Sequence, residues 1–194
     1  MTARIDLLRH GETERGGGFR GSLDDALTPR GWQQMRDAVA GAGPWDVLVS
    51  SPLQRCAAFA RDLAERSRLP LYLDADLREL HFGEWEGRSA AELMQVDADA
   101  LGRFWADPYG YTPPGGEPLL HFEQRVLAAL QRLQRRFARQ RLLVVGHAGV
   151  MRLLLARQRG LPRERLLEVV VAHGELLPLR VSRPGAVGAA GCTS

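Results

Sequence analysis

Lysine is missing from this chain, so arginine supplies all 26 of its basic residues. The 23 acidic residues leave a modest formal net charge of +3. The arginines are scattered along the sequence rather than gathered in a stripe, and this distribution argues against a nucleic-acid-binding surface. We therefore expect no nucleic-acid partner.

Cysteine and long apolar runs are also scarce. Cys56 and Cys192 are too few for a disulfide framework, which fits a reducing compartment. Cys56 falls on an apolar helical face, so we expect it to pack in the core. Arg4 and Asp6 interrupt the stretch in which a signal peptide would be apolar. No run approaches the roughly 18 apolar residues that cross a membrane. We expect a cytoplasmic protein with no membrane partner.

The length and composition are those of one globular domain: 194 residues, 45% hydrophobic and 25% charged. We expect a single domain over residues 1–182. The small residues of 183–194 predict a loosely held C-terminal tail.

Short apolar runs alternate with amphipathic stretches along the chain. Strands are expected at residues 5–8, 46–50, 71–73, 142–145, 166–172 and 175–181. Helices are expected at residues 29–41, 51–63, 90–96, 101–105, 122–137 and 150–157. This alternation indicates an α/β fold. We predict a three-layer α/β/α sandwich around a mostly parallel central sheet.

The first predicted strand stops at Arg9-His10-Gly11, and ligands of α/β proteins bind just beyond the carboxyl ends of such strands. The Arg9 guanidinium can hold a dianion. The His10 imidazole can act as a nucleophile or carry a proton. Gly11 lets the backbone approach a ligand closely. The tripeptide taken alone fits a plain strand end and turn equally well, so the interpretation depends on further motifs.

Two further predicted strands are followed by residues that could also bind or stabilise a phosphoryl group. Arg55 comes after the strand at 46–50 and is a second candidate phosphate ligand. His147 comes after the strand at 142–145 and, if protonated, would donate to the charge that builds up in a transition state. The backbone N–H of Ala148, at the start of a helix, would add a donor. Alternatively, Arg55 is a surface residue and His147 a hydrogen-bonded strand-end histidine.

Two loops carry the remaining candidates. Glu79 is flanked by Leu80 and Phe82, and an apolar setting would keep a proton on its carboxyl for a leaving oxygen. Pairing with Arg78 is the alternative. The glycine-rich segment 16–22 can fold over a ligand. Its candidate substrate-binding residues are Arg20 and Gly21. His81, His121 and His173 are expected to be structural or on the surface.

The sequence lacks the residue spacings that other phosphatase mechanisms require. Arg61 follows Cys56 by five positions, whereas a cysteine phosphatase needs six. Residues 74–78 (DADLR) lack the threonine of an aspartate nucleophile of the haloacid type. No histidine pair or carboxylate cluster favours a metal site. We therefore expect a metal-independent reaction without a cofactor.

Residues 7–13 (LLRHGET) resemble the signature of the histidine phosphatase superfamily, which includes the cofactor-dependent phosphoglycerate mutases. Residues 50–55 (SSPLQR), 79–87 (ELHFGEWEG) and 146–149 (GHAG) are similar to three more of its motifs. The resemblance implies a phosphoglycerate mutase-like fold and a catalytic set with His10 as the phosphorylated residue. The other members that it implies are Arg9, Arg55, Glu79 and His147, with Glu79 as the proton donor.

The chain departs from the family pattern in the first loop. Many members place an asparagine that helps to hold phosphate three residues after the position of Thr13, where this chain has Gly16. Arg20 is a hypothetical replacement for that contact. Ala148 stands where a glycine is usual, but its backbone donor remains.

The function implied is a phosphomonoesterase that forms a phosphohistidine at His10 and passes the phosphoryl group to water. Its partner is a small-molecule phosphate ester. Residues 16–22, 79–86, 105–108 and 113–117 most resemble the α-ribazole phosphatases of cobalamin (vitamin B12) biosynthesis, which implies α-ribazole 5'-phosphate as the substrate. A phosphoglycerate mutase or a broad-specificity sugar-phosphate phosphatase is the alternative. A non-catalytic module that binds a phospho-ligand is a third possibility, and the oligomeric state is open.

Overall fold

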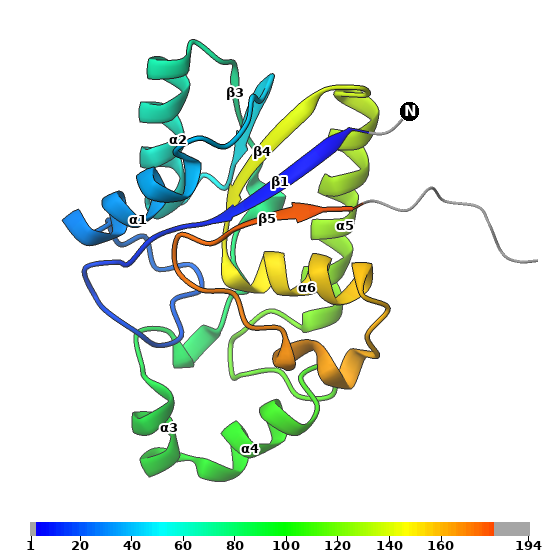
Figure 1. Cartoon of the computed structure of the whole chain (residues 1–194). Coiled ribbons are helices and arrows are strands. Elements are labelled where there is room, and N and C mark those ends of the chain that lie inside the picture. The colour runs from blue at the N-terminus through cyan, green and yellow to red at the C-terminus, as the bar shows by residue number, and fades with distance from the viewer. Residues whose placement is uncertain (1–2, 181–194) are drawn as a thin grey trace, which may run out of the picture.

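The central sheet has five strands in the order β3-β2-β4-β1-β5 (Figure 1), and the computed structural model describes residues 3–180. The strands are β1 (Arg4–Arg9), β2 (Val47–Ser50), β3 (Leu71–Leu73), β4 (Arg141–Gly146) and β5 (Leu176–Leu179). The first four run parallel, and β5 pairs antiparallel with β1. The predicted mostly parallel sheet is confirmed.

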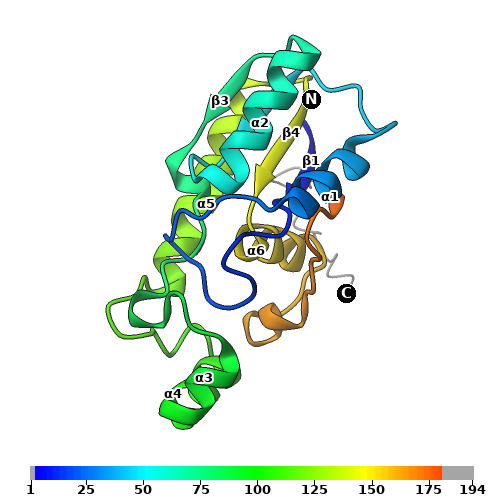
Figure 2. The same cartoon turned by 90° about the vertical axis from the view of Figure 1, so that its left-hand side faces the viewer.

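Helices cover both faces of this sheet, with α1 and α2 on one side and α5 and α6 on the other (Figures 1 and 2). The α-helices are α1 (Pro29–Val39), α2 (Gln54–Ser67), α3 (Ala90–Val96), α4 (Ala98–Ala106), α5 (Leu119–Arg136) and α6 (Ala148–Gln158). Three short 3₁₀ helices are η1 (Ala75–Leu77), η2 (Gly83–Trp85) and η3 (Arg163–Glu168). The pair α3 and α4 lies beyond one end of the sheet (Figure 2). The predicted three-layer sandwich is confirmed.

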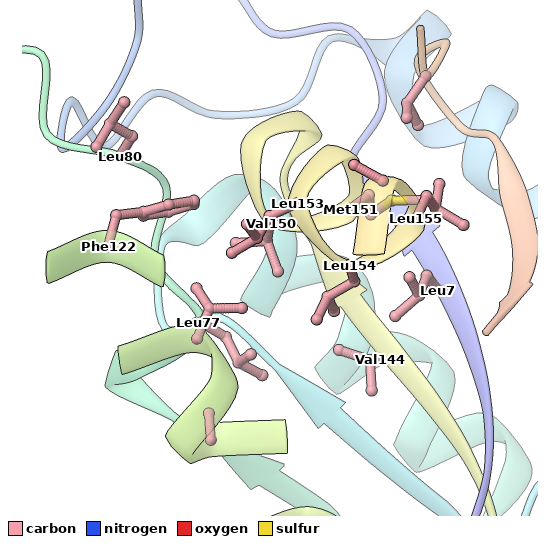
Figure 3. Close-up of a cluster of buried hydrophobic side chains, with 14 of the residues drawn as sticks. Leu7, Leu77, Leu80, Phe122, Val144, Val150, Met151, Leu153, Leu154 and Leu155 are labelled. Atoms are coloured by element: carbon pink, nitrogen blue, oxygen red, sulfur yellow. The ribbon is translucent and has the colours of Figure 1, made fainter. Parts of the chain in front are cut away.

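The strands divide their side chains between two cores, because successive residues point to opposite faces. Leu7 of β1 packs in the core that holds α5 and α6, whereas its neighbour Leu8 packs in the core of α1 and α2. Figure 3 shows Leu154 of α6 beside Leu7 and Val144. Each fully buried leucine contributes about 1.5–3 kcal/mol relative to an exposed one. This packing fixes the strand ends that carry the site.

The start of α1 follows from local chemistry. The Thr28 hydroxyl accepts a hydrogen bond from the N–H of Gly31 at 2.9 Å, and Pro29 occupies the first helical turn. A Cβ atom on Gly11 would lie 2.1 Å from the Gly31 carbonyl oxygen. These two glycines therefore let the chain that leaves β1 cross tightly over the start of α1.

The strand predicted at 166–172 is wrong. Its first part belongs to η3, and residues 169–172 form no strand. β5 occupies the sheet edge beside β1, and arginine side chains bind carbonyls in the segment: Arg152 Nε donates to Val169 (2.8 Å) and Arg9 Nη1 to Val171 (2.6 Å). An apolar run in the sequence does not show whether its backbone carbonyls will accept hydrogen bonds from a neighbouring strand or from arginine side chains.

The predicted tail at 183–194, with Cys192, lies outside the described residues, so the domain boundary at 182 stays a prediction. Among residues 3–180, no helix combines the length and apolar character that a membrane crossing requires.

Candidate active site

The carboxyl ends of β1, β2 and β4 meet beside a cavity of about 360 Å³. Six of the predicted site residues line this cavity: Arg9, His10, Arg20, Arg55, Glu79 and Ala148. The other two contact that lining. The Gly21 carbonyl accepts a hydrogen bond from Arg55, and the His147 ring packs edge-on against His10 with centroids 5.4 Å apart. The predicted residues therefore come together.

The His10 ring is held in one tautomer. Its Nδ1 atom lies 2.8 Å from the carbonyl oxygen of Gly11, which can only accept a hydrogen bond, so Nδ1 carries the proton. Nε2 is then left with a lone pair. Burial of the ring, followed by the charge of Arg55, lowers the pKa of His10 well below its usual value. His10 is therefore a neutral base near pH 7.

The Arg9 guanidinium is anchored at both terminal nitrogens. Nη1 donates to the carbonyl of Val171 at 2.6 Å, and Nη2 donates to Nε2 of His173 at 2.9 Å. Among the described residues, its buried Nε has no hydrogen-bond partner. An unsatisfied buried donor costs about 1–3 kcal/mol, so the arrangement suits a site that binds an anion.

Arg55 lies in the first turn of α2 and is fully buried. Nη2 donates to the Gly21 carbonyl at 2.8 Å and Nη1 to the Leu23 carbonyl, while Asp25 lies 3.6 Å from Nη1. These contacts tie the end of the glycine-rich segment to α2. The Nε of Arg55, like that of Arg9, has no partner in the described part of the chain. The surface alternative for Arg55 is therefore wrong.

Glu79 lies over the N-terminus of α6. One carboxylate oxygen accepts from the N–H of Gly149 and the other from the N–H of Leu80, each at 3.0 Å. The Arg125 side chain binds the Glu79 backbone carbonyl at 2.9 Å and so fastens this loop to α5. Arg78 Nε instead donates to the Ala75 carbonyl, and within residues 3–180 the Glu79 carboxylate is bound by backbone N–H groups rather than by Arg78. The alternative pairing is therefore wrong.

His147 is fully buried, and its Nε2 lies 2.8 Å from the Ser51 hydroxyl. Burial, followed by the charge of Arg55, lowers the pKa of His147 well below its usual value. The ring is therefore neutral near pH 7 and has one N–H donor. The protonated ring considered in the sequence analysis would have two. Cys56 is buried as predicted, with Sγ 3.6 Å from His147 Nε2.

Residues 5–187 match the model of the histidine phosphatase superfamily (branch 1). The chain belongs to this superfamily. The predicted family, fold and enzyme class are thereby confirmed.

The similarity of this histidine phosphatase to known proteins extends over most of its length. Adenosylcobalamin/alpha-ribazole phosphatase of Escherichia coli (strain K12) is 34% identical over 175 residues, 88% of this chain and 86% of that one. Glucosyl-3-phosphoglycerate phosphatase of Mycolicibacterium vanbaalenii is 34% identical over 173 residues, covering 82% of this chain and 75% of that one. The crystal structure of the alpha-ribazole phosphatase from Shigella flexneri has a TM-score of 0.78 and 32% identity, covering 97% of this chain and 100% of that one.

The first loop of this histidine phosphatase is held by Arg20. Nη2 donates to the carbonyls of Arg15, Gly16 (2.8 Å) and Gly17 (2.9 Å), and Nε lies 3.2 Å from the Gly16 oxygen. Arg20 lines the cavity, but these donors bind its own loop. The expected contact between Arg20 and phosphate stays a prediction.

Arg152 and His173 line the cavity but were not among the predicted site residues, and His173 was expected to be structural or on the surface. Arg152 lies one helical turn after Ala148, so both residues are on the same side of α6 and both line the cavity. This spacing could have identified Arg152 from the sequence. His173 follows a segment predicted as a strand, and no local pattern separates it from a turn residue. Its position beside Arg9 arises from a contact across 164 residues.

A second cavity of about 360 Å³ adjoins the first and is mostly apolar. Phe19, Phe82, Gly149 and Arg152 line both cavities. The rest of the second lining is: Leu80, Phe104, Trp105, Pro108, Leu119, Phe122, Leu166 and Leu167. Phe19 and Phe82 pack edge to face with ring centroids 4.9 Å apart. The candidate active site thus combines a cationic pocket with an aromatic one.

No group of three or more His, Cys, Asp or Glu side chains within residues 3–180 is arranged to hold a metal ion. The expected metal-independent reaction remains a prediction.

Proposed function

We propose that this histidine phosphatase hydrolyses α-ribazole 5'-phosphate for cobalamin biosynthesis through a phosphohistidine at His10. The observation that carries the proposal is the orientation of the His10 ring. The hydrogen bond from Nδ1 to Gly11 leaves the Nε2 lone pair available, in a cavity that Arg9 and Arg55 also line. Within residues 3–180 the Nε donors of both arginines are unpaired. The cytoplasm is the compartment we propose, and cell fractionation tests it.

The first step transfers the phosphoryl group to the protein. Arg9 and Arg55 hold the phosphoryl oxygens, and the Nε2 lone pair of His10 forms a bond to phosphorus as the phosphorus–oxygen bond of the ester breaks. Glu79, entering this step as the carboxylic acid, gives its proton to the departing oxygen. The N–H groups of His147 and Ala148 add donors to the transition state.

The second step returns the enzyme to its starting state. A water molecule attacks the phosphorus of the phosphohistidine, and the Glu79 carboxylate takes up one of its protons. The bond from phosphorus to Nε2 breaks, and the electron pair returns to the His10 ring. Inorganic phosphate leaves, and the net reaction consumes one ester and one water.

The aromatic cavity supports an ester whose leaving group carries a planar, apolar ring. α-Ribazole carries an aromatic base, and a cavity lined by Phe19, Phe82 and Trp105 suits such a ring. Arg152, which lines both cavities, can bind polar groups between the base and the phosphate. The similarity to the Escherichia coli enzyme supports the same assignment.

A sugar-phosphate phosphatase is the second candidate, favoured by the similarity to glucosyl-3-phosphoglycerate phosphatase. It would use the same phosphate pocket. A mutase would return the phosphoryl group to its substrate instead of passing it to water.

The test is release of inorganic phosphate from α-ribazole 5'-phosphate, 3-phosphoglycerate, glucosyl-3-phosphoglycerate and nucleotides. We expect the highest kcat/KM with α-ribazole 5'-phosphate and an acid-labile phosphoryl label on His10 that His10→Asn lacks. A preference for sugar phosphates would favour the second candidate. Isomerisation of 3-phosphoglycerate without phosphate release, in the presence of a bisphosphate primer, would identify a mutase.

We further expect Phe19→Ala to raise KM for α-ribazole 5'-phosphate. The same change should leave KM for glycerol phosphate, which has no ring for the aromatic cavity, almost unaltered. An equal loss for both esters would contradict the assignment of the base to this cavity.

A further inference from the structure

The turn at residues 172–175 is fastened to the end of β1. The N–H of Arg9 donates to the Glu175 carbonyl at 3.0 Å, and the N–H of Gly174 donates to the His10 carbonyl at 3.3 Å. Gly174 has a φ of +70°, and a Cβ atom there would lie 2.8 Å from Cβ of Gln34 on α1. The turn is therefore held against both β1 and α1, with little room to move.

This turn brings a third histidine into the candidate active site. His173 lines the phosphate cavity, and its ring centroid lies 5.6 Å from that of His10. Its Nε2 lies 2.9 Å from Nη2 of Arg9. A guanidinium nitrogen only donates, so Nε2 of His173 is the acceptor and its proton is on Nδ1.

The surroundings keep His173 in that form. Arg9 donates to the ring, and the carboxylate of Glu12, in the loop after β1, supplies the charge that opposes that of Arg9. Burial, followed by the charge of Arg9, lowers the pKa of His173. His173 is thus a neutral acceptor near pH 7.

The segment 171–173 therefore accepts hydrogen bonds from both terminal nitrogens of the Arg9 guanidinium. Val171 accepts from Nη1 and His173 from Nη2, which fixes the plane of the Arg9 side chain. The buried Nε donor then has a defined direction. If the bond to His173 is lost, a single anchor remains and the plane can rotate.

We propose that His173 is a positioning residue that orients the Arg9 guanidinium toward the phosphoryl group. The inference rests on the proposed phosphoryl transfer at His10. A misplacement of about 1 Å in a catalytic group costs about 100-fold in rate, so the loss of one anchor is expected to be measurable.

The test compares His173→Leu, which removes the acceptor, with His173→Asn, whose amide oxygen can accept from Arg9. His121, exposed on α5, provides the control variant His121→Leu. We expect His173→Leu to lower kcat by about 10–100-fold, with a smaller change in KM. Affinity for orthovanadate, which mimics the transferred group, should fall with kcat. His173→Asn should recover most of both losses, and the melting temperature reports any unfolding.

A double-mutant cycle shows whether His173 acts through Arg9. In an Arg9→Lys background, His173→Leu should cause little further loss of vanadate affinity, because coupled residues are not additive. Equal losses in both backgrounds would overturn the inference, as would wild-type kcat and vanadate affinity in His173→Leu.

Vanadate binding also separates the two proposals. If the wild-type protein hydrolyses no phosphate ester, the proposed function fails, and the vanadate titrations still decide the role of His173. If the wild-type protein is active and His173→Leu matches it, only the inference about His173 fails.

Discussion

Glu79 and Gly149 are in direct contact: the Glu79 carboxylate accepts the Gly149 N–H at 3.0 Å, and a Cβ atom at 149 would lie 2.2 Å from the other carboxylate oxygen. Glycine at this position lets the carboxylate reach the N-terminus of α6. This contact places Glu79, the proposed acid, at the N-terminus of the helix that also carries the Ala148 N–H donor.

We predict that Gly149→Ala displaces Glu79 and lowers kcat by about 10–100-fold. Steady-state assays with an alkyl phosphate measure the effect. Gly102→Ala on α4 is the matched control, because a Cβ atom at 102 meets no atom within 4 Å. Full activity in Gly149→Ala would show that the carboxylate does not need this contact.

Glu79→Gln should slow esters with poor leaving groups more than aryl esters. An alkoxide needs a proton as it departs, whereas an aryl oxide leaves without one, and general acid catalysis contributes about 10²–10⁴-fold. The comparison is kcat/KM for an alkyl phosphate and for p-nitrophenyl phosphate. Glutamine can keep one of the two hydrogen bonds, from Gly149 or from Leu80, through its single amide oxygen. Equal losses for both esters would count against Glu79 as the proton donor.

Arg20→Ala should raise KM for phosphate esters about tenfold, since a hydrogen bond from a charged group contributes about 1.5–3 kcal/mol. Arg20 both lines the cavity and holds the carbonyls of the first loop. Arg15→Ala, in the same loop and exposed, is the control. An unchanged KM would end the idea that Arg20 replaces the asparagine missing at Gly16.

The buried histidines predict how stability depends on pH. The pKa values of His10 and His147 are lowered in the folded protein, whereas both residues have ordinary values when unfolded. As the pH falls below about 6.5, the unfolded chain binds protons that the folded chain does not. The free energy of unfolding should therefore fall with pH, by at most about 1.4 kcal/mol per pH unit for each histidine.

Urea denaturation across this pH range measures the slope. His10→Gln should reduce it by roughly the share of one histidine, and His121→Gln, at an exposed position, should leave it unchanged. If His10→Gln has the wild-type slope, His10 does not stay neutral in the folded protein.

The sequence predicted most of the phosphate pocket because the pocket follows from strand ends. Arg9 and His10, Arg55, and His147 each come shortly after an apolar run, and parallel strands bring such ends to one edge of a sheet. The carboxyl end of a strand is a local feature that a pattern of apolar residues can locate. The start of α1, predicted at residue 29, is likewise local, because Thr28 and Pro29 fix it through contacts within one turn.

Contacts between distant segments account for what the sequence did not reveal. His173 meets Arg9 across 164 residues, and the segment before it satisfies its carbonyls with arginine side chains rather than a neighbouring strand. The aromatic cavity gathers side chains from the first loop, α4, α5 and η3. An apolar or aromatic residue carries no local mark of the partner it will meet, so such contacts are set by how the helices pack on the sheet.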